Sequence, residues 1–158
     1  MQVKIRAATE ADLDHLARLH SESYPRQFSS RQWVRSNFHA YPRIMLFAAE
    51  MDGVLVGYIQ WIQKSGFRKE AVLELEQIAV TPTWRNQHVG TTLIKESLQL
   101  VDVYLQAQGS QLKSVIVTTR TDNHAQQLYK SALGAMPQAV IKDLYSHDEV
   151  IMIANLRV

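Results

Sequence analysis

The sequence has no cysteine among its 158 residues, and this absence excludes several kinds of chemistry at once. Disulfide bonds, zinc–thiolate sites and thiol nucleophiles all require cysteine. A chain without disulfides suits a reducing compartment, so we expect a cytoplasmic protein. The six histidines show no spacing typical of metal ligands, and we therefore expect no metal site.

Long apolar runs and a strong charge imbalance are also missing. No apolar stretch approaches the ~20 residues that a membrane-spanning helix needs, so we expect no membrane partner. The formal net charge of +2 is too small to indicate nucleic-acid binding. Neither repeats nor low-complexity segments divide the chain. A hydrophobic content of 46% and a charged content of 20% predict one globular domain over residues 1–158.

Hydrophobic periodicity predicts a mixed α/β domain. Asp52-Gly53 predicts a hairpin turn, and Gly57 inside the following strand indicates a bulge or a close backbone approach. The predicted strands are 3–6, 43–51, 54–63, 71–80, 114–119, 139–145 and 149–155. The predicted helices are 10–20 behind an N-cap at Thr9, 31–39, about 89–106, and 123–133 before Gly134.

The stretch from Val80 to Leu93 joins the fourth strand to the third helix. A turn marked by Pro82 and a polar loop containing Gly90 lie between them. The first backbone N–H groups of a helix have no partner within the helix, and the helix dipole adds partial positive charge there. Such a loop can therefore bind phosphate oxygens, although a plain strand-to-helix turn has the same pattern.

Two familiar phosphate-binding motifs do not fit this loop. A P-loop requires Gly-x-x-x-x-Gly-Lys-Ser/Thr, which is absent from the sequence. A dinucleotide fingerprint requires three glycines, whereas this loop has only Gly90.

The loop resembles the acyl-CoA signature of the GNAT family of N-acetyltransferases, whose pattern is Gln/Arg-x-x-Gly-x-Gly/Ala. A second segment resembles the Asn-x-x-Ala-x-x-Leu-Tyr helix of the same family, and residues 5–12 are similar to the first strand and helix of many members. The two matching motifs are Val80-x-Pro82-x-x-Arg85-x-x-His88-x-Gly90-x-x-Leu93 and Asp122-x-x-Ala125-x-x-Leu128-Tyr129.

The resemblance implies a mostly antiparallel sheet that is flanked by helices and splayed between strands 4 and 5. The pantetheine arm of acetyl-CoA would lie in the splay and bond the backbone near Ile78 and Val80, and its pyrophosphate would contact N–H groups of residues 85–91. The residues expected to bind acetyl-CoA are Ile78, Ala79, Val80, Arg85, Asn86, Gln87, His88, Val89, Gly90, Thr91 and Asn123.

The sequence departs from the family pattern at two positions. His88 replaces the first loop glycine, and because histidine is enriched at positive φ we expect a left-handed backbone there. Asp122, with Asn123 beside it, replaces the usual asparagine. These departures keep a second hypothesis open, namely a catalytically inactive CoA- or metabolite-binding module. A domain that acts only through protein contacts is a third.

Two residues are candidates for catalysis. The resemblance places Tyr129 as the general acid near the CoA sulfur, whereas its position on an apolar helix stripe also fits a core aromatic residue. Glu76 lies two residues before Ile78, so we expect it to share a face with Ile78 and Val80 and to act as the base. A solvated strand end would explain Glu76 equally. Glu74 is the alternative base if a bulge alters the facing.

The leading prediction is therefore an acetyl-CoA-dependent N-acetyltransferase. The lack of cysteine favours direct attack by an amine acceptor in a ternary complex. Dimers are common in the family, so a homodimer is compatible with the resemblance. The basic segments Arg26–Arg35 and Lys64–Lys69 are either solvated faces or sites for an acidic acceptor or the 3′-phosphate of CoA. Aromatic side chains that either line an acceptor pocket or simply pack are Tyr24, Phe28, Trp33 and Trp61.

Overall fold

The structure, a computed structural model, describes residues 2–156 and has the predicted order of strands and helices. The strands are β1 (Lys4–Ala7), β2 (Ile44–Met51), β3 (Val54–Gln63), β4 (Glu70–Val80), β5 (Gln111–Arg120), β6 (Met136–Ile141) and β7 (Glu149–Asn155). The helices are α1 (Leu13–Ser23), α2 (Ser30–His39), α3 (Val89–Ala107) and α4 (Ala125–Leu133), with short 3-10 turns at Glu10–Asp12 and Pro82–Trp84.

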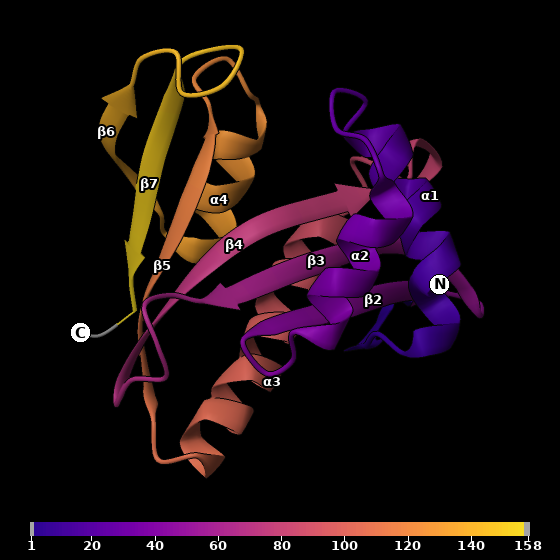
Figure 1. Ribbon diagram of the computed structural model, residues 1–158, viewed down its shortest axis with the longest axis horizontal. Helices are drawn as coiled ribbons and strands as arrows, with labels where there is room; N and C mark the ends of the chain where they lie inside the picture. The colour runs from indigo at the N-terminus through magenta and orange to yellow at the C-terminus, as the bar shows by residue number, and fades with distance from the viewer. Residues whose placement is uncertain (1, 157–158) are drawn as a thin grey trace.

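The strands form one sheet in the order β1-β2-β3-β4-β5-β7-β6. All neighbouring pairs within it are antiparallel except β4 and β5, which are parallel. Helices α1 and α2 cover one face of the N-terminal half, while α3 and α4 lie on the other face (Figure 1). The predicted mixed, mostly antiparallel α/β sheet is confirmed.

Two apolar clusters hold the helices to the sheet. Leu16 of α1 and Tyr58 of β3 belong to the cluster under α1 and α2, whereas Leu93 of α3 and Trp61 of β3 belong to the cluster under α3 and α4. All four side chains are at most 1% exposed. Because neighbouring strand residues point to opposite faces, β3 contributes to both clusters.

Gly57 confirms the expected irregularity in β3. The pairing with β2 skips Val56, so the bulge lies directly beside the glycine. A Cβ at position 57 would stand 2.8 Å from the carbonyl oxygen of Ala79 and 3.2 Å from Cδ1 of Leu93. No side chain fits there, and the absence of one lets β3, β4 and α3 pack closely.

Several predicted boundaries differ from the structure, and three of the differences are informative. The loop predicted from residue 21 begins later, since α1 continues to Ser23. The last helix begins at Ala125 rather than 123, because the side-chain oxygen of Asn123 accepts the N–H of Ala125 at 2.9 Å. The prediction of a strand over 139–145 was wrong, since β6 occupies 136–141. Pro137 obscured it in the sequence, but an edge strand tolerates proline.

Candidate active site

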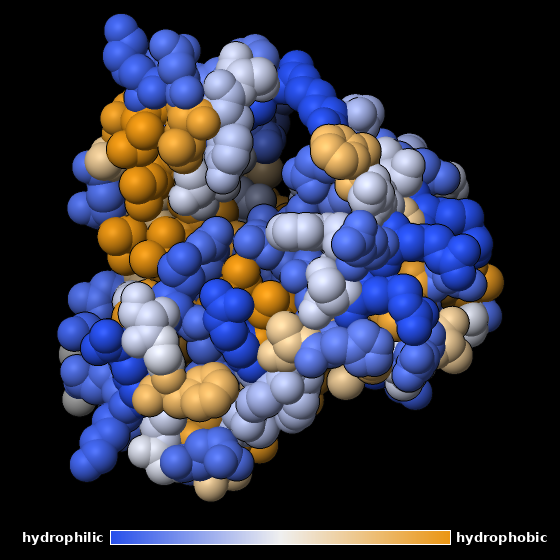
Figure 2. Space-filling view, viewed as in Figure 1, coloured by the Kyte–Doolittle hydropathy of each residue, from blue (hydrophilic) through white to orange (hydrophobic). Residues whose placement is uncertain are grey.

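Strands β4 and β5 separate in the middle of the sheet. Their pairing runs from Glu70↔Gln111 to Glu74↔Ile116, after which β4 continues alone to Val80. In Figure 1 the ends of the two strands diverge, and Figure 2 shows the surface hollowed between α1 and the β5–β7 half. The predicted splay between strands 4 and 5 is therefore present, and it leaves one edge of β4 open.

A bulge in β4 determines which way its carboxylates face. Gln60 pairs with Gln77 and the next residue of β3 pairs with Leu75, so Glu76 is the extra residue. Glu76 accepts a hydrogen bond from the amide of Gln60, which lies on the α1/α2 face of β3. Ile78 instead packs against the cluster under α3.

The prediction that Glu76 shares a face with Ile78 and Val80 was therefore wrong. Side chains alternate between the two faces of a strand only while the strand is unbroken. The bulge at Glu76 interrupts this alternation, so residues before and after it no longer face as predicted. Glu74 and Glu76 both lie on the α1/α2 face, where Glu74 pairs with Lys64 at 3.2 Å.

The half-buried carboxyl of Glu76 has a raised pKa. Burial is the largest cause, and the negative charge of Glu74 raises the pKa further, while the hydrogen bond from Gln60 opposes the shift. A carboxylate with a raised pKa is a better proton acceptor at neutral pH than an ordinary one. The environment of Glu76 therefore suits a general base.

Tyr24, just after α1, contacts the open edge of β4. Its hydroxyl donates to the carbonyl oxygen of Ile78 at 3.0 Å and accepts the N–H of Ile78 at 3.2 Å. Burial raises the pKa of Tyr24 to about 12, so the phenol remains protonated at neutral pH. From the sequence we expected Tyr24 either to line an acceptor pocket or simply to pack, and this contact with the backbone was not predicted.

A buried polar network anchors Tyr24. His20 is 0% exposed and stacks on Tyr24 with ring centroids 5.3 Å apart. The His20 ring bonds Ser30 at 2.7 Å and Gln27 at 2.8 Å, which ties the end of α1 to the start of α2. Gln77 of β4 donates to the Gln27 side chain at 3.2 Å and joins the network to the sheet. A glutamine at a core-facing strand position was the signal in the sequence for this network.

Tyr129 lies on α4 and is 6% exposed. It packs in the cluster under α3, as the stripe on α4 predicted. Its pKa is raised, first by burial and then by the nearby Tyr24. The two phenols are therefore close enough to interact, and Tyr129 remains protonated at neutral pH.

The loop before α3 has the expected left-handed residue. His88 has φ 64° and ψ 12°, and Asn86 has φ 59°. α3 begins directly after His88, so the first N–H groups of a nineteen-residue helix, at Val89, Gly90 and Thr91, have no partner within the helix. This end of α3 is consequently a suitable site for phosphate oxygens.

Side chains around this loop hold the backbone in place. Arg85 donates to the carbonyl oxygen of Val80 at 3.0 Å, and Gln87 donates to that of Thr83 at 3.0 Å. A Cβ on Gly90 would stand 3.2 Å from Cδ2 of Leu128, so the glycine also lets α3 approach α4. These contacts are structural, and the binding role predicted for these residues rests on their backbone N–H groups.

The other aromatic and basic residues that the sequence suggested for the site have separate environments. Trp61 is 1% exposed and donates to Ser97 at 2.8 Å, so it belongs to the core and not to an acceptor pocket. Phe28 is 88% exposed. In the first basic segment, Arg31 pairs with Asp14 at 3.2 Å and Arg35 with Glu10 at 3.4 Å.

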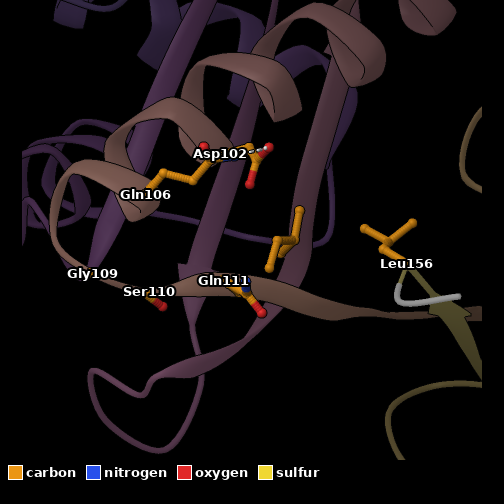
Figure 3. Close-up of a pocket in the computed structure, with 7 residues that line it drawn as sticks. Asp102, Gln106, Gly109, Ser110, Gln111 and Leu156 are labelled. Carbon is orange, nitrogen blue, oxygen red and sulfur yellow. Dashed lines mark hydrogen bonds between the residues drawn. The ribbon is translucent and has the colours of Figure 1, made fainter.

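Two surface hollows lie away from the splay. One, of about 630 Å³, lies between the end of α3 and the start of β5, with Asp102, Gln106 and Leu156 among its lining residues (Figure 3). Asp102, the first of its lining residues on α3, is ~20 Å along the helix from Val89, given 1.5 Å per helical residue. The other, of about 580 Å³, lies beside the β3–β4 hairpin. Neither overlaps the candidate site.

Residues 2–156 contain neither a metal-binding cluster nor a helix suited to a membrane. Within that part of the chain, no three histidine or carboxylate side chains gather closely enough to hold a metal ion. None of its helices has both the length and the apolar character needed to cross a membrane.

Comparison with known proteins identifies the family. The sequence profile of the Acetyltransferase (GNAT) family matches residues 13–135. A protein of Bacillus subtilis (strain 168), provisionally named a ribosomal protein bS18-alanine N-acetyltransferase, is 26% identical over an alignment of 150 residues. The alignment covers 89% of this chain and 87% of the relative.

Solved structures share the fold. Ard1 from Thermoplasma volcanium is similar with a TM-score of 0.80 and 19% identity over 100% of both chains. An aminoglycoside 6′-N-acetyltransferase in complex with coenzyme A is similar with a TM-score of 0.76 and 17% identity over 100% of this chain and 98% of that one. The chain therefore belongs to the GNAT family of acetyltransferases, and it is an N-acetyltransferase.

Proposed function

We propose that this protein transfers the acetyl group of acetyl-CoA to a primary amine by direct attack within a ternary complex. The observation that carries the proposal is the open edge of β4. There the N–H and C=O of Ile78 bond the partly buried phenol of Tyr24, which interacts with the buried phenol of Tyr129, and Glu76 on the same strand has a raised pKa. This edge supplies backbone groups, a candidate acid and a candidate base within one cleft.

The residues present fit acetyl-CoA. The free N–H groups at the start of α3 suit the pyrophosphate, and β4 beyond Glu74 has an unpaired edge for the amide groups of pantetheine. The N–H of Ile78 would donate to the thioester carbonyl and stabilise the negative charge that develops on its oxygen. Acetyl-CoA supplies an activated carbonyl carbon and a thiolate leaving group.

Two side chains would move the protons. Glu76 accepts the proton of the ammonium group, directly or through one water, so that the neutral nitrogen attacks the carbonyl carbon. As the carbon–nitrogen bond forms and the carbon–sulfur bond breaks, Tyr129 gives its proton to the sulfur. The nitrogen loses its second proton as the amide forms, and this proton, passed through solvent, restores the Tyr129 phenol. The products are the N-acetyl amide and the free thiol. The protonated Glu76 then releases its proton to solvent and is a carboxylate again.

The acceptor that we propose is the amino terminus of a polypeptide. The name of the Bacillus subtilis relative, which specifies an alanine of a ribosomal protein, supports this class. On the α1/α2 face Glu76 is the carboxylate nearest the splay, so the acceptor would enter from that face while acetyl-CoA lies across the sheet on α3.

Thiol release measured with acetyl-CoA and a panel of amines tests the proposal. We expect turnover with peptides that have a free amino terminus and much less with the same peptides blocked by acetylation. Stabilisation by acetyl-CoA in a thermal shift without any thiol release would instead identify an inactive CoA-binding module. The absence of both would refute acetyl-CoA as the ligand.

A further inference from the structure

Half of the residues that line the hollow beside the β3–β4 hairpin are basic. Its volume is about 580 Å³, and it lies on the α1/α2 face of the sheet, because Val72 and Ile116 of its floor point away from the cluster under α3. The residues that line it are Lys64, Ser65, Arg68, Lys69, Glu70, Val72, Lys113 and Ile116.

Two cations of this hollow are not paired. Lys64 forms a salt bridge with Glu74, and Lys113 forms one with Glu70 at 3.7 Å. Within residues 2–156, no salt bridge involves Arg68 or Lys69, and both side chains are exposed. Among the residues that the structure describes, the Arg68 guanidinium donates only to the carbonyl oxygen of Ser65, at 2.9 Å. The hollow therefore has an excess of positive charge above an apolar floor.

The position of the hollow excludes contact with the phosphates of CoA. It lies at the start of β4, whereas α3 begins after the other end of this eleven-residue strand. At ~3.3 Å per residue the strand is ~33 Å long. The hollow and the start of α3 also lie on opposite faces of the sheet, and the 3′-phosphate of CoA is only a few bonds from its pyrophosphate.

The hollow and the candidate base lie along the same face of β4. Val72, Glu74 and Glu76 follow one another on the α1/α2 side, and Lys64 reaches over to Glu74. From Val72 to Glu76 the strand advances ~13 Å, which an extended peptide covers in about four residues. A polypeptide whose amino terminus lies at Glu76 would thus place its fourth or fifth residue over the hollow.

We propose that this basic hollow selects acceptor polypeptides that have acidic residues about four positions after the acetylated amino terminus. Arg68 and Lys69 would contact the carboxylates, while Val72 and Ile116 would pack against the intervening side chains. The inference rests on the proposed function, since it names the acceptor class for the same active site. It also gives a role to the second basic segment, Lys64–Lys69. The first segment does not share this role, because Arg31 pairs with Asp14 and Arg35 pairs with Glu10.

A charge reversal tests the assignment. The variant Arg68→Glu with Lys69→Glu is compared with Lys4→Glu and Arg18→Glu, an equal charge change at exposed positions on β1 and α1. The acceptors are three peptides that differ only at positions four and five, which are acidic, neutral or basic. Initial rates of thiol release give kcat/KM for each pair.

For the unaltered protein we expect the acidic peptide to be preferred about tenfold over the neutral one, as two exposed ion pairs would provide, and the preference to shrink at high salt. The variant with Arg68→Glu and Lys69→Glu should lose this preference but keep its rate with the neutral peptide. The control variant with Lys4→Glu and Arg18→Glu should retain the preference for the acidic peptide.

Equal rates for the three peptides with the unaltered protein would overturn the inference and leave the proposed function intact. Loss of binding to a labelled single-stranded oligonucleotide in the hollow variant, without any change in peptide preference, would assign the surface to nucleic acid instead. Thiol release with none of the peptides, despite correct folding, would contradict the proposed function itself.

Discussion

The hydroxyl of Tyr24 makes two hydrogen bonds to one residue, Ile78, as donor to its carbonyl oxygen and as acceptor of its N–H. Ile78 is the backbone position that we assign to the thioester carbonyl. In the structure, therefore, a side chain of the protein occupies the site where the carbonyl oxygen of acetyl-CoA would bind.

We predict that Tyr24→Phe strengthens binding of acetyl-CoA but not of CoA. Without the hydroxyl, the N–H of Ile78 has no partner to exchange when the thioester binds. A neutral hydrogen bond contributes about 1 kcal/mol, so the dissociation constant of acetyl-CoA should fall about fivefold. Isothermal titration with both ligands measures the ratio.

The control for this change is Tyr58→Phe, which removes a buried phenol hydroxyl that bonds Gln77 at 3.0 Å and not Ile78. It should leave the ratio of the two affinities unchanged. Weaker binding of acetyl-CoA to Tyr24→Phe would show that the hydroxyl contacts the thioester rather than competing with it.

Substitution of the base should affect chemistry more than binding. We expect Glu76→Gln to lower kcat/KM for a peptide acceptor by about 10²- to 10³-fold, in the range of a lost general base. The affinity for acetyl-CoA should stay the same. A reduction below threefold would remove Glu76 from the mechanism.

The pH dependence provides a sharper test through Glu74→Gln. In the unaltered protein the negative charge of Glu74 contributes to the raised pKa of Glu76. Removal of that charge favours the ionised form of Glu76 and lowers its pKa, so the acidic limb of the kcat/KM profile should move to lower pH. No movement of the limb would mean that it reports another group.

Tyr129→Phe should slow thiol release by about tenfold to a hundredfold, because the phenol no longer protonates the leaving sulfur. The dissociation constant of CoA should be unaffected, and Tyr104→Phe on α3 serves as the control. Stopped-flow detection of free thiol measures the rate of release, and isothermal titration measures the dissociation constant of CoA. Normal release in Tyr129→Phe would leave this residue with a packing role alone.

The left-handed backbone at His88 makes a prediction for stability. His88→Gly should preserve or raise the free energy of unfolding, whereas His88→Val should lower it by about 1–2 kcal/mol, since a β-branched side chain is strained at φ 64°. Urea unfolding measures both. Equal stability of the valine and glycine variants would contradict the strain.

Asp12, just before α1, forms a salt bridge with Arg6 of β1, with 2.7 Å between Oδ2 of Asp12 and Nη1 of Arg6. The hydrogen bond from Arg6 is the largest cause that lowers the pKa of Asp12 from 3.8 to about 2. This depressed pKa contributes about 2 kcal/mol of stability above pH 3.8, which is lost as the pH falls towards 2. Asp12→Asn should show the loss at pH 7 and a flatter acid profile in urea titrations, and an unchanged profile would exclude Asp12.

Much of this protein could be predicted from its sequence because the signals are local. Alternation and helical spacing located the elements, Gly57 marked a close approach, and His88 marked a left-handed turn. Edge strand β6 was misplaced because neither of its faces is buried, so its sequence has no alternation to detect.

The sequence by itself determined the order of the elements and the exposed helix start, since hydrophobic period and turn residues act over a few neighbouring positions. The splayed sheet was expected only from the resemblance to the GNAT family. Only the tertiary structure decided that Glu76 faces α1 and α2, because the bulge that turns it depends on pairing with β3. It alone also brought Tyr24 to Ile78, 54 residues away, through packing that no local pattern encodes.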